Sequence, residues 1–112
     1  MDDALATLWD AALYINKYGW ATGQLYGEST EDNAPACILG AIMAVRPNKR
    51  SQQQALNKLA NWLIWTTDIS VSRLRPLAAR YVVSGFNDCY VSDAEGACAV
   101  LERAVAQMAA ED

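Results

Sequence analysis

The chain contains no histidine among its 112 residues. Ser-His-Asp and Cys-His catalysis both require an imidazole, so the sequence excludes these mechanisms and most zinc sites as well. Histidine is also the side chain best suited to proton transfer near neutral pH. No spacing among the remaining residues points to a catalytic residue or a metal ligand, and we therefore expect neither enzymatic activity nor a cofactor.

Cysteine is scarce. Cys37, Cys89 and Cys98 form an odd number without CxxC spacing, which argues against a disulfide framework and is typical of a reducing compartment. Cys37 and Cys98 fall on predicted core faces, where free cysteine behaves as a small hydrophobe. The first residues are acidic, whereas a secretory signal begins basic and then becomes apolar. The sequence therefore predicts a cytoplasmic protein.

Long hydrophobic runs are also absent, because no apolar segment reaches the roughly 20 residues that span a bilayer. The uncharged segment 35–45, PACILGAIMAV, is nevertheless apolar or small on every side. A helix of this composition must be enclosed by the rest of the protein. We therefore predict a buried central helix at residues 35–46, with Pro35 in its first turn, and no contact with a membrane.

Hydrophobic periodicity indicates that the rest of the chain is helical. The chain is 53% hydrophobic and 20% charged, which is typical of one globular domain. We predict a single all-α domain over residues 1–112, a bundle of about five helices around the central helix. Besides residues 35–46, the expected helices are 3–18, a helix opening at Ser51, 72–83, and a last helix opening at Ser92.

Two short patterns suggest where helices begin. Ser51 with Gln54, and Ser92 with Glu95, have the form of capping boxes, in which each side chain bonds the other's backbone N–H. Residues 84–91 are expected to form a link before the last helix.

Tryptophan is plentiful for a chain of this length. Trp9 and Trp62 fall on predicted core stripes, whereas Trp65 lies about 120° from the middle of its stripe, taking 100° per residue. Trp65, Ile64 and Tyr14 are therefore candidates for a surface that binds a partner, because tryptophan is enriched at binding hot spots. The alternative is that they are scattered exposed aromatics, which are normal on protein surfaces.

Charge is distributed unevenly. The net charge is −4, yet residues 46–80 carry +6 and the remainder carries −10. The simpler explanation is a solvated dipolar surface. The alternative is that residues 46–80 bind an anionic ligand or nucleic acid. Overall acidity argues against non-specific nucleic-acid binding, which depends on neutralising phosphates. The candidate anion-binding residues are Arg46, Lys49, Arg50, Arg73 and Arg75.

Three short motifs carry a family resemblance: Gly19-Trp20, then a C-x-x-G-A pattern beginning at Cys37, then Phe86-Asn87-Asp88 before a terminal helix. The chain resembles a family of small uncharacterised proteins from actinobacteria and their phages. It departs from the family pattern at Phe86, where a tryptophan is expected. The resemblance implies an actinobacterial or phage setting, with the host cytoplasm as the location in the phage case, and it implies no catalytic activity.

The same motifs suggest a polar cluster. In one interpretation Trp20, Cys37, Asn87 and Asp88 line a ligand pocket. In the other, Asn87 and Asp88 bond free backbone groups and hold the junction between the last two helices.

These observations predict a small, non-enzymatic protein-binding module that acts through another protein or through self-association. In a phage setting it would modulate a host protein. The alternative is a protein that binds an anionic ligand or nucleic acid through residues 46–80.

Overall fold

The computed structural model describes residues 2–22, 34–66 and 79–111. This part of the chain contains no strand, which confirms the all-α prediction. It forms five helices: α1 (Asp3–Tyr18), α2 (Ile38–Val45), α3 (Lys49–Thr66), α4 (Ala79–Tyr90) and α5 (Ala94–Glu111).

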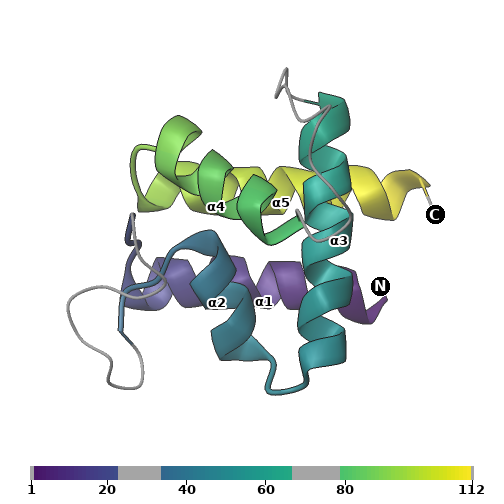
Figure 1. Cartoon of the computed structure of the whole chain (residues 1–112), viewed down its shortest axis with the longest axis horizontal. Helices are drawn as coiled ribbons and strands as arrows, with labels where there is room; N and C mark the ends of the chain where they lie inside the picture. The colour runs from purple at the N-terminus through teal and green to yellow at the C-terminus, as the bar shows by residue number, and fades with distance from the viewer. Residues whose placement is uncertain (1, 23–33, 67–78, 112) are drawn as a thin grey trace.

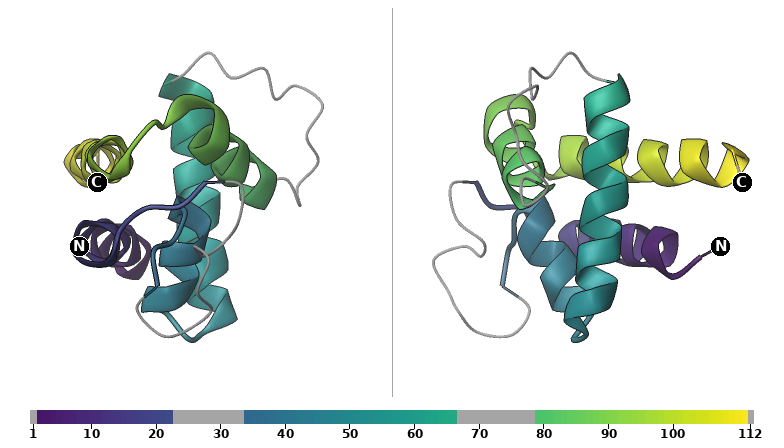
Figure 2. Two further views of the ribbon diagram at one scale, coloured as in Figure 1. Left: turned by 90° about the vertical axis from the view of Figure 1, so that its left-hand side faces the viewer. Right: turned by 45° about the vertical axis from the view of Figure 1, so that its right-hand side comes forward.

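The helices form two layers around one core. Helices α1 and α5 lie side by side in opposite directions, and the left view of Figure 2 shows both end-on. Helices α2, α3 and α4 make the second layer, in which α3 crosses α1 and α5 steeply (Figure 1). Helix α2 contacts α1, α3 and α4, as expected of a central helix.

Helix α1 has the bounds that its periodicity predicts. The Asp2 side chain accepts a hydrogen bond from the Leu5 N–H (2.8 Å) and caps the start. Gly19 ends the helix with a positive φ of 104°, which favours glycine, and its N–H donates to the Ile15 carbonyl. Trp9 was expected in the core but is 41% exposed, because it lies about 120° from the middle of the buried stripe of α1.

Helix α2 is shorter than predicted. It begins at Ile38 rather than at Pro35, because Cys37 has extended backbone angles and acts as the N-cap, with its Sγ accepting from the Gly40 N–H at 3.3 Å. Ala36 is held extended by a backbone bridge to Trp20. The enclosure is also partial: residues 38–42 are buried, whereas Ala44 is exposed.

Helices α3 and α5 begin at caps that the capping-box patterns did not predict. Asn48 caps α3 by accepting from the Arg50 N–H (2.8 Å), so this helix begins before Ser51. Asp93 caps α5 by accepting from the Gly96 N–H (2.7 Å). Asn, Asp and Ser are comparably strong N-caps, so residue type alone does not decide between Asn48 and Ser51 or between Asp93 and Ser92.

Helix α4 differs most from its prediction. It was expected at residues 72–83, but the described helix runs to Tyr90, and residues 67–78 lie outside the described part. The expected link at 84–91 is therefore largely helical. Gly85, inside the expected link, lies on the exposed face of this helix with open space around it. The buried residues of α4 follow helical spacing: Ala79, Val82, Val83, Phe86 and Asn87.

Candidate functional site

The last turns of α3 carry an exposed tryptophan beside a cavity. Trp65 is 87% exposed, in agreement with its angular position in the sequence. Trp62 lies one turn earlier, is half-buried, and donates from Nε1 to the Gln107 Oε1 on α5 (2.8 Å). We call the cavity of about 390 Å³ between these helices the α3–α5 groove. It is lined by Lys58, Asn61, Trp62, Trp65, Thr66, Gln107, Met108 and Glu111.

The other two residues predicted for partner binding do not join this groove. Ile64 neighbours Trp65 in the chain but is half-buried against the core. Tyr14 belongs to α1, where its hydroxyl donates to the Ala34 carbonyl (2.8 Å) and its ring lies 4.8 Å from that of Tyr18. The structure therefore places Tyr14 in a structural contact rather than in one patch with Trp65.

Sequence reasoning missed the other apolar members of the groove. Trp62 was expected in the core, yet Trp62 and Met108 are both half-buried and line the cavity. The signal in the sequence was the pair of tryptophans three residues apart, since side chains at i and i+3 are neighbours on a helix surface.

The basic residues that the structure describes between positions 46 and 80 divide into those that form ion pairs with acids and those that do not. Arg46 lies beside two acids of α1, with its NH1 3.0 Å from the Asp10 Oδ2 and its Nε 3.7 Å from the Asp3 Oδ1. Lys58 contacts the Asp2 carboxylate at 2.6 Å. That hydrogen bond is the main reason why the pKa of Asp2 is lowered, with a smaller contribution from a backbone N–H.

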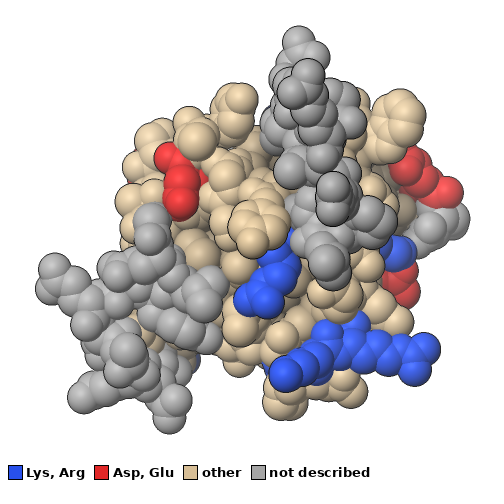
Figure 3. Space-filling model, in the orientation of Figure 1, with Lys and Arg blue, Asp and Glu red and all other residues tan. Residues whose placement is uncertain are grey.

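Arg46 and Lys58 therefore act mainly within the protein and add little to an anion-binding face. Lys49 and Arg50 are exposed, whereas Arg73 and Arg75 lie outside the residues that the structure describes. Figure 3 shows Lys and Arg side chains gathered on the lower half of one face, around α2 and α3, with the acidic side chains nearer its left and right margins.

The polar cluster predicted from the short motifs does come together. The Asn87 side chain is 0% exposed. Its Oδ1 accepts from the Trp20 Nε1 (2.7 Å) and from the Ile38 N–H (3.0 Å). Its Nδ2 donates to the Ala21 carbonyl (3.1 Å) and to the Asp88 Oδ1 (3.0 Å). Each atom of the amide thus has two partners, which leaves none for a ligand.

The cluster ties α4 to the start of α2, rather than holding the junction between α4 and α5. The Ile38 N–H is one of the first donors of α2, which have no partner inside the helix. Cys37 is the N-cap of the same helix, and burial raises the pKa of its thiol. A protonated thiol is a poor nucleophile, so this geometry favours a structural role for Cys37.

No helix in the described residues combines the length and apolar character needed to cross a membrane.

Comparison with known proteins identifies the family of the chain. No curated protein and no solved structure matches the chain. Residues 1–107 match a family of unknown function, DUF6197, and the chain belongs to this family.

Proposed function

We propose that this protein is a non-enzymatic binding module that docks a protein partner on the α3–α5 groove, with Trp65 as the anchor. The observation that carries the proposal is the 87% exposure of Trp65 beside a cavity of about 390 Å³. Isolated exposed apolar residues are common, but a tryptophan at the edge of a groove is typical of a binding hot spot.

The energy available from covering Trp65 is large enough for specific binding. A tryptophan side chain buries on the order of 150–250 Å² of surface. At about 25 cal/mol per Å² of apolar area, covering the exposed part of Trp65 would contribute about 4 kcal/mol before the costs of association. This one side chain is therefore expected to dominate the interface.

The rim of the groove indicates the chemistry of the partner. Trp62 and Met108 supply an apolar floor, while Asn61 and Gln107 supply amides at the edge. Among the described residues, the charged members are Lys58 and Glu111, so this part of the rim has little net charge. The matching surface is an apolar side chain surrounded by hydrogen-bonding groups, and its binding should depend little on salt.

The test compares Trp65→Ala with Tyr81→Ala. Tyr81 is a matched control because it is 74% exposed on α4, away from the groove. Both variants should fold, since deleting a core aromatic costs about 3–5 kcal/mol but an exposed one costs far less. Trp65→Ala should reduce the amount of partner captured in a pull-down, or the self-association measured by sedimentation velocity. Tyr81→Ala should change neither.

Two results would overturn the proposal. If Trp65→Ala is unfolded in a thermal melt, the side chain belongs to the core. If both variants are folded and have the same capture and association as the parent, the groove is not the interface.

A second candidate function rests on the unpaired basic residues. Lys49 and Arg50 are exposed, and no ion pair joins either of them to an acid in the described part of the chain. They would attract an anionic ligand or nucleic acid. Binding of this kind weakens steeply with salt, whereas docking on the groove does not, so a salt titration separates the two functions.

The biological setting is part of the proposal. The motifs at Gly19-Trp20, Cys37 and Phe86-Asn87-Asp88 support an actinobacterial or phage protein that acts in the bacterial cytoplasm. In that setting the partner of the groove is a host protein whose activity is modulated by binding. Detection of the protein in the soluble fraction of infected or native cells would test this placement.

A further inference from the structure

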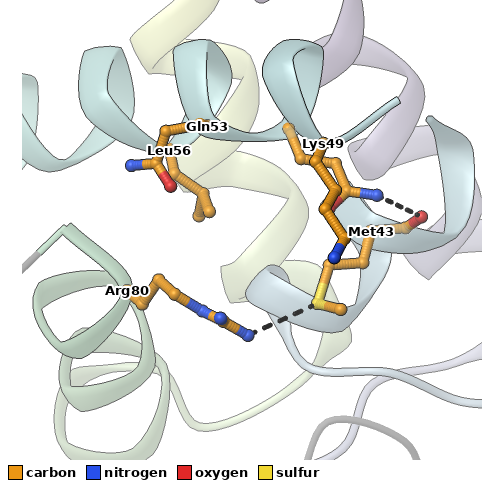
Figure 4. Close-up of a pocket in the computed structure, with 6 residues that line it drawn as sticks. Met43, Lys49, Gln53, Leu56 and Arg80 are labelled. Atoms are coloured by element: carbon orange, nitrogen blue, oxygen red, sulfur yellow. Dashed lines mark hydrogen bonds between the residues drawn. The ribbon is translucent and has the colours of Figure 1, made fainter. Parts of the chain in front are cut away.

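A second cavity lies where α2, α3 and α4 meet. Its volume is about 290 Å³, which is at the small end of the roughly 300–1,000 Å³ typical of ligand pockets. Figure 4 shows its lining, with Lys49 and Arg80 pointing toward the Met43 side chain from opposite sides. The six lining residues are Met43, Lys49, Gln52, Gln53, Leu56 and Arg80.

Among the residues that the structure describes, the lining carries two cations and no acid. The Arg80 guanidinium donates to the Met43 Sδ at 4.0 Å. A thioether sulfur is only a weak acceptor, so this contact does little to neutralise the charge of Arg80. No ion pair joins Lys49 or Arg80 to a carboxylate in the described residues, in contrast to Arg46 and Lys58. Two neighbouring cations without a counter-charge produce a positive potential that an anion would neutralise.

The walls of this cavity are held in place before any ligand arrives. Gln52 donates from Nε2 to the carbonyls of Arg46 (2.5 Å) and Met43 (3.4 Å), which fixes the end of α2 against α3. Gln53 donates to the Asn57 Oδ1 on the next turn of α3 (2.8 Å). A site formed in advance spends less binding energy on ordering its own side chains.

The floor of the cavity is apolar. Leu56 is buried, and Met43 is half-buried beside it. A ligand that fits both parts has an anionic group for the cations and a short apolar group for the floor. The planar guanidinium of Arg80 suits two oxygens of a phosphate, and the Lys49 ammonium adds a point charge.

We infer that this cavity binds a small phosphate monoester with an apolar group, through Arg80 and Lys49. The inference develops the anionic-ligand alternative above and is independent of the α3–α5 groove. It adds Arg80 to the anion-binding residues predicted from the sequence and removes Arg46, which is engaged by Asp3 and Asp10.

The experiment is a titration of the protein with phenyl phosphate, followed by backbone amide NMR shifts. Phenol and inorganic phosphate each carry one half of this ligand, the ring or the phosphate. Each should bind at least fivefold more weakly than phenyl phosphate. Arg80→Gln should weaken phenyl phosphate binding at least tenfold, and Lys49→Gln severalfold. Arg103→Gln is the matched control, because Arg103 is an exposed cation of α5 that does not line the cavity. It should change binding less than twofold.

A vesicle assay separates a free phosphate ester from a lipid headgroup of the same chemistry. Cosedimentation with phosphatidic acid vesicles that Arg80→Gln abolishes would assign the phosphate to a lipid. Binding of phenyl phosphate that depends on Arg80, without cosedimentation, would assign it to a soluble molecule.

Three results would overturn the inference: no binding of phenyl phosphate or of vesicles, equal binding by Arg80→Gln and the parent, or equal losses in Arg80→Gln and Arg103→Gln. The last result would show a response to net charge alone. Both Arg variants alter exposed side chains, and a thermal melt checks that they remain folded. Trp65→Ala should leave phenyl phosphate binding unchanged, so failure of this inference and failure of the groove are distinguishable.

Discussion

Replacing Asn87 tests whether the polar cluster is structural. Asn87→Ala removes the acceptor of the Ile38 N–H and of the Trp20 indole, and also the donor to the Ala21 carbonyl. The Ile38 N–H is in the core and has no helical partner, and leaving such a donor unsatisfied costs about 1–3 kcal/mol. The vacated space and the half-buried Trp20 bond add to this cost. We expect a total loss of about 3 kcal/mol in the free energy of unfolding.

The assay is urea unfolding followed by circular dichroism. Slopes of about 1–3 kcal/mol/M are typical of small proteins, so a loss of this size moves the midpoint by about 1–3 M. Asn61→Ala is the control, because Asn61 is exposed on α3, and it should change stability by less than about 0.5 kcal/mol.

A second substitution at the same position adds a dependence on pH. Asn87→Asp keeps the acceptor toward the Ile38 N–H but places a carboxylate oxygen opposite the Ala21 carbonyl and the Asp88 carboxylate. It should destabilise the protein at neutral pH, and its deficit relative to the parent should shrink as the new carboxyl protonates. If Asn87→Ala unfolds within about 1 kcal/mol of the parent, the structural interpretation is wrong and the ligand-pocket interpretation regains support.

Two further predictions concern a helix interior and the thiols. Gly85→Ala should raise stability by about 1 kcal/mol in the same urea assay, because the added methyl meets nothing within 4 Å and alanine favours the helix; a loss of stability would show that α4 is not helical at this position. In the native protein, iodoacetamide should modify Cys89 quickly, since it is exposed, and Cys37 only after unfolding, because burial raises its thiol pKa. Equal labelling of the two cysteines under native conditions would contradict the burial of the α2 N-cap.

The helical fold was predictable from local pattern, while helix boundaries were less so. Helix α1 has the predicted bounds because its apolar stripe, an acidic cap and a terminal glycine all agree. The starts of α3 and α5 were misplaced because two capping residues stand close together, and the sequence pattern does not rank Asn48 against Ser51 or Asp93 against Ser92. Helix α4 was misplaced because residues 84–91 were interpreted as a link, although the apolar spacing of Val82 and Val83 continues to Phe86.

The candidate sites were predictable only in part. The exposure of Trp65 followed from its angle on α3, a local property. Its neighbour Met108 in the groove comes from α5, and helical periodicity does not say which helix will lie beside Trp65.

The sequence by itself determined that the chain is helical, which helix faces are apolar, and that imidazole chemistry is absent. Only the tertiary structure decided which polar groups meet. It brought Asn87 to the start of α2, paired Arg46 with Asp3 and Asp10, and left Lys49 and Arg80 facing one cavity. The physical reason is range: helix formation depends on contacts three or four residues apart, whereas these partners are separated by 31 to 49 residues and meet only when whole helices pack.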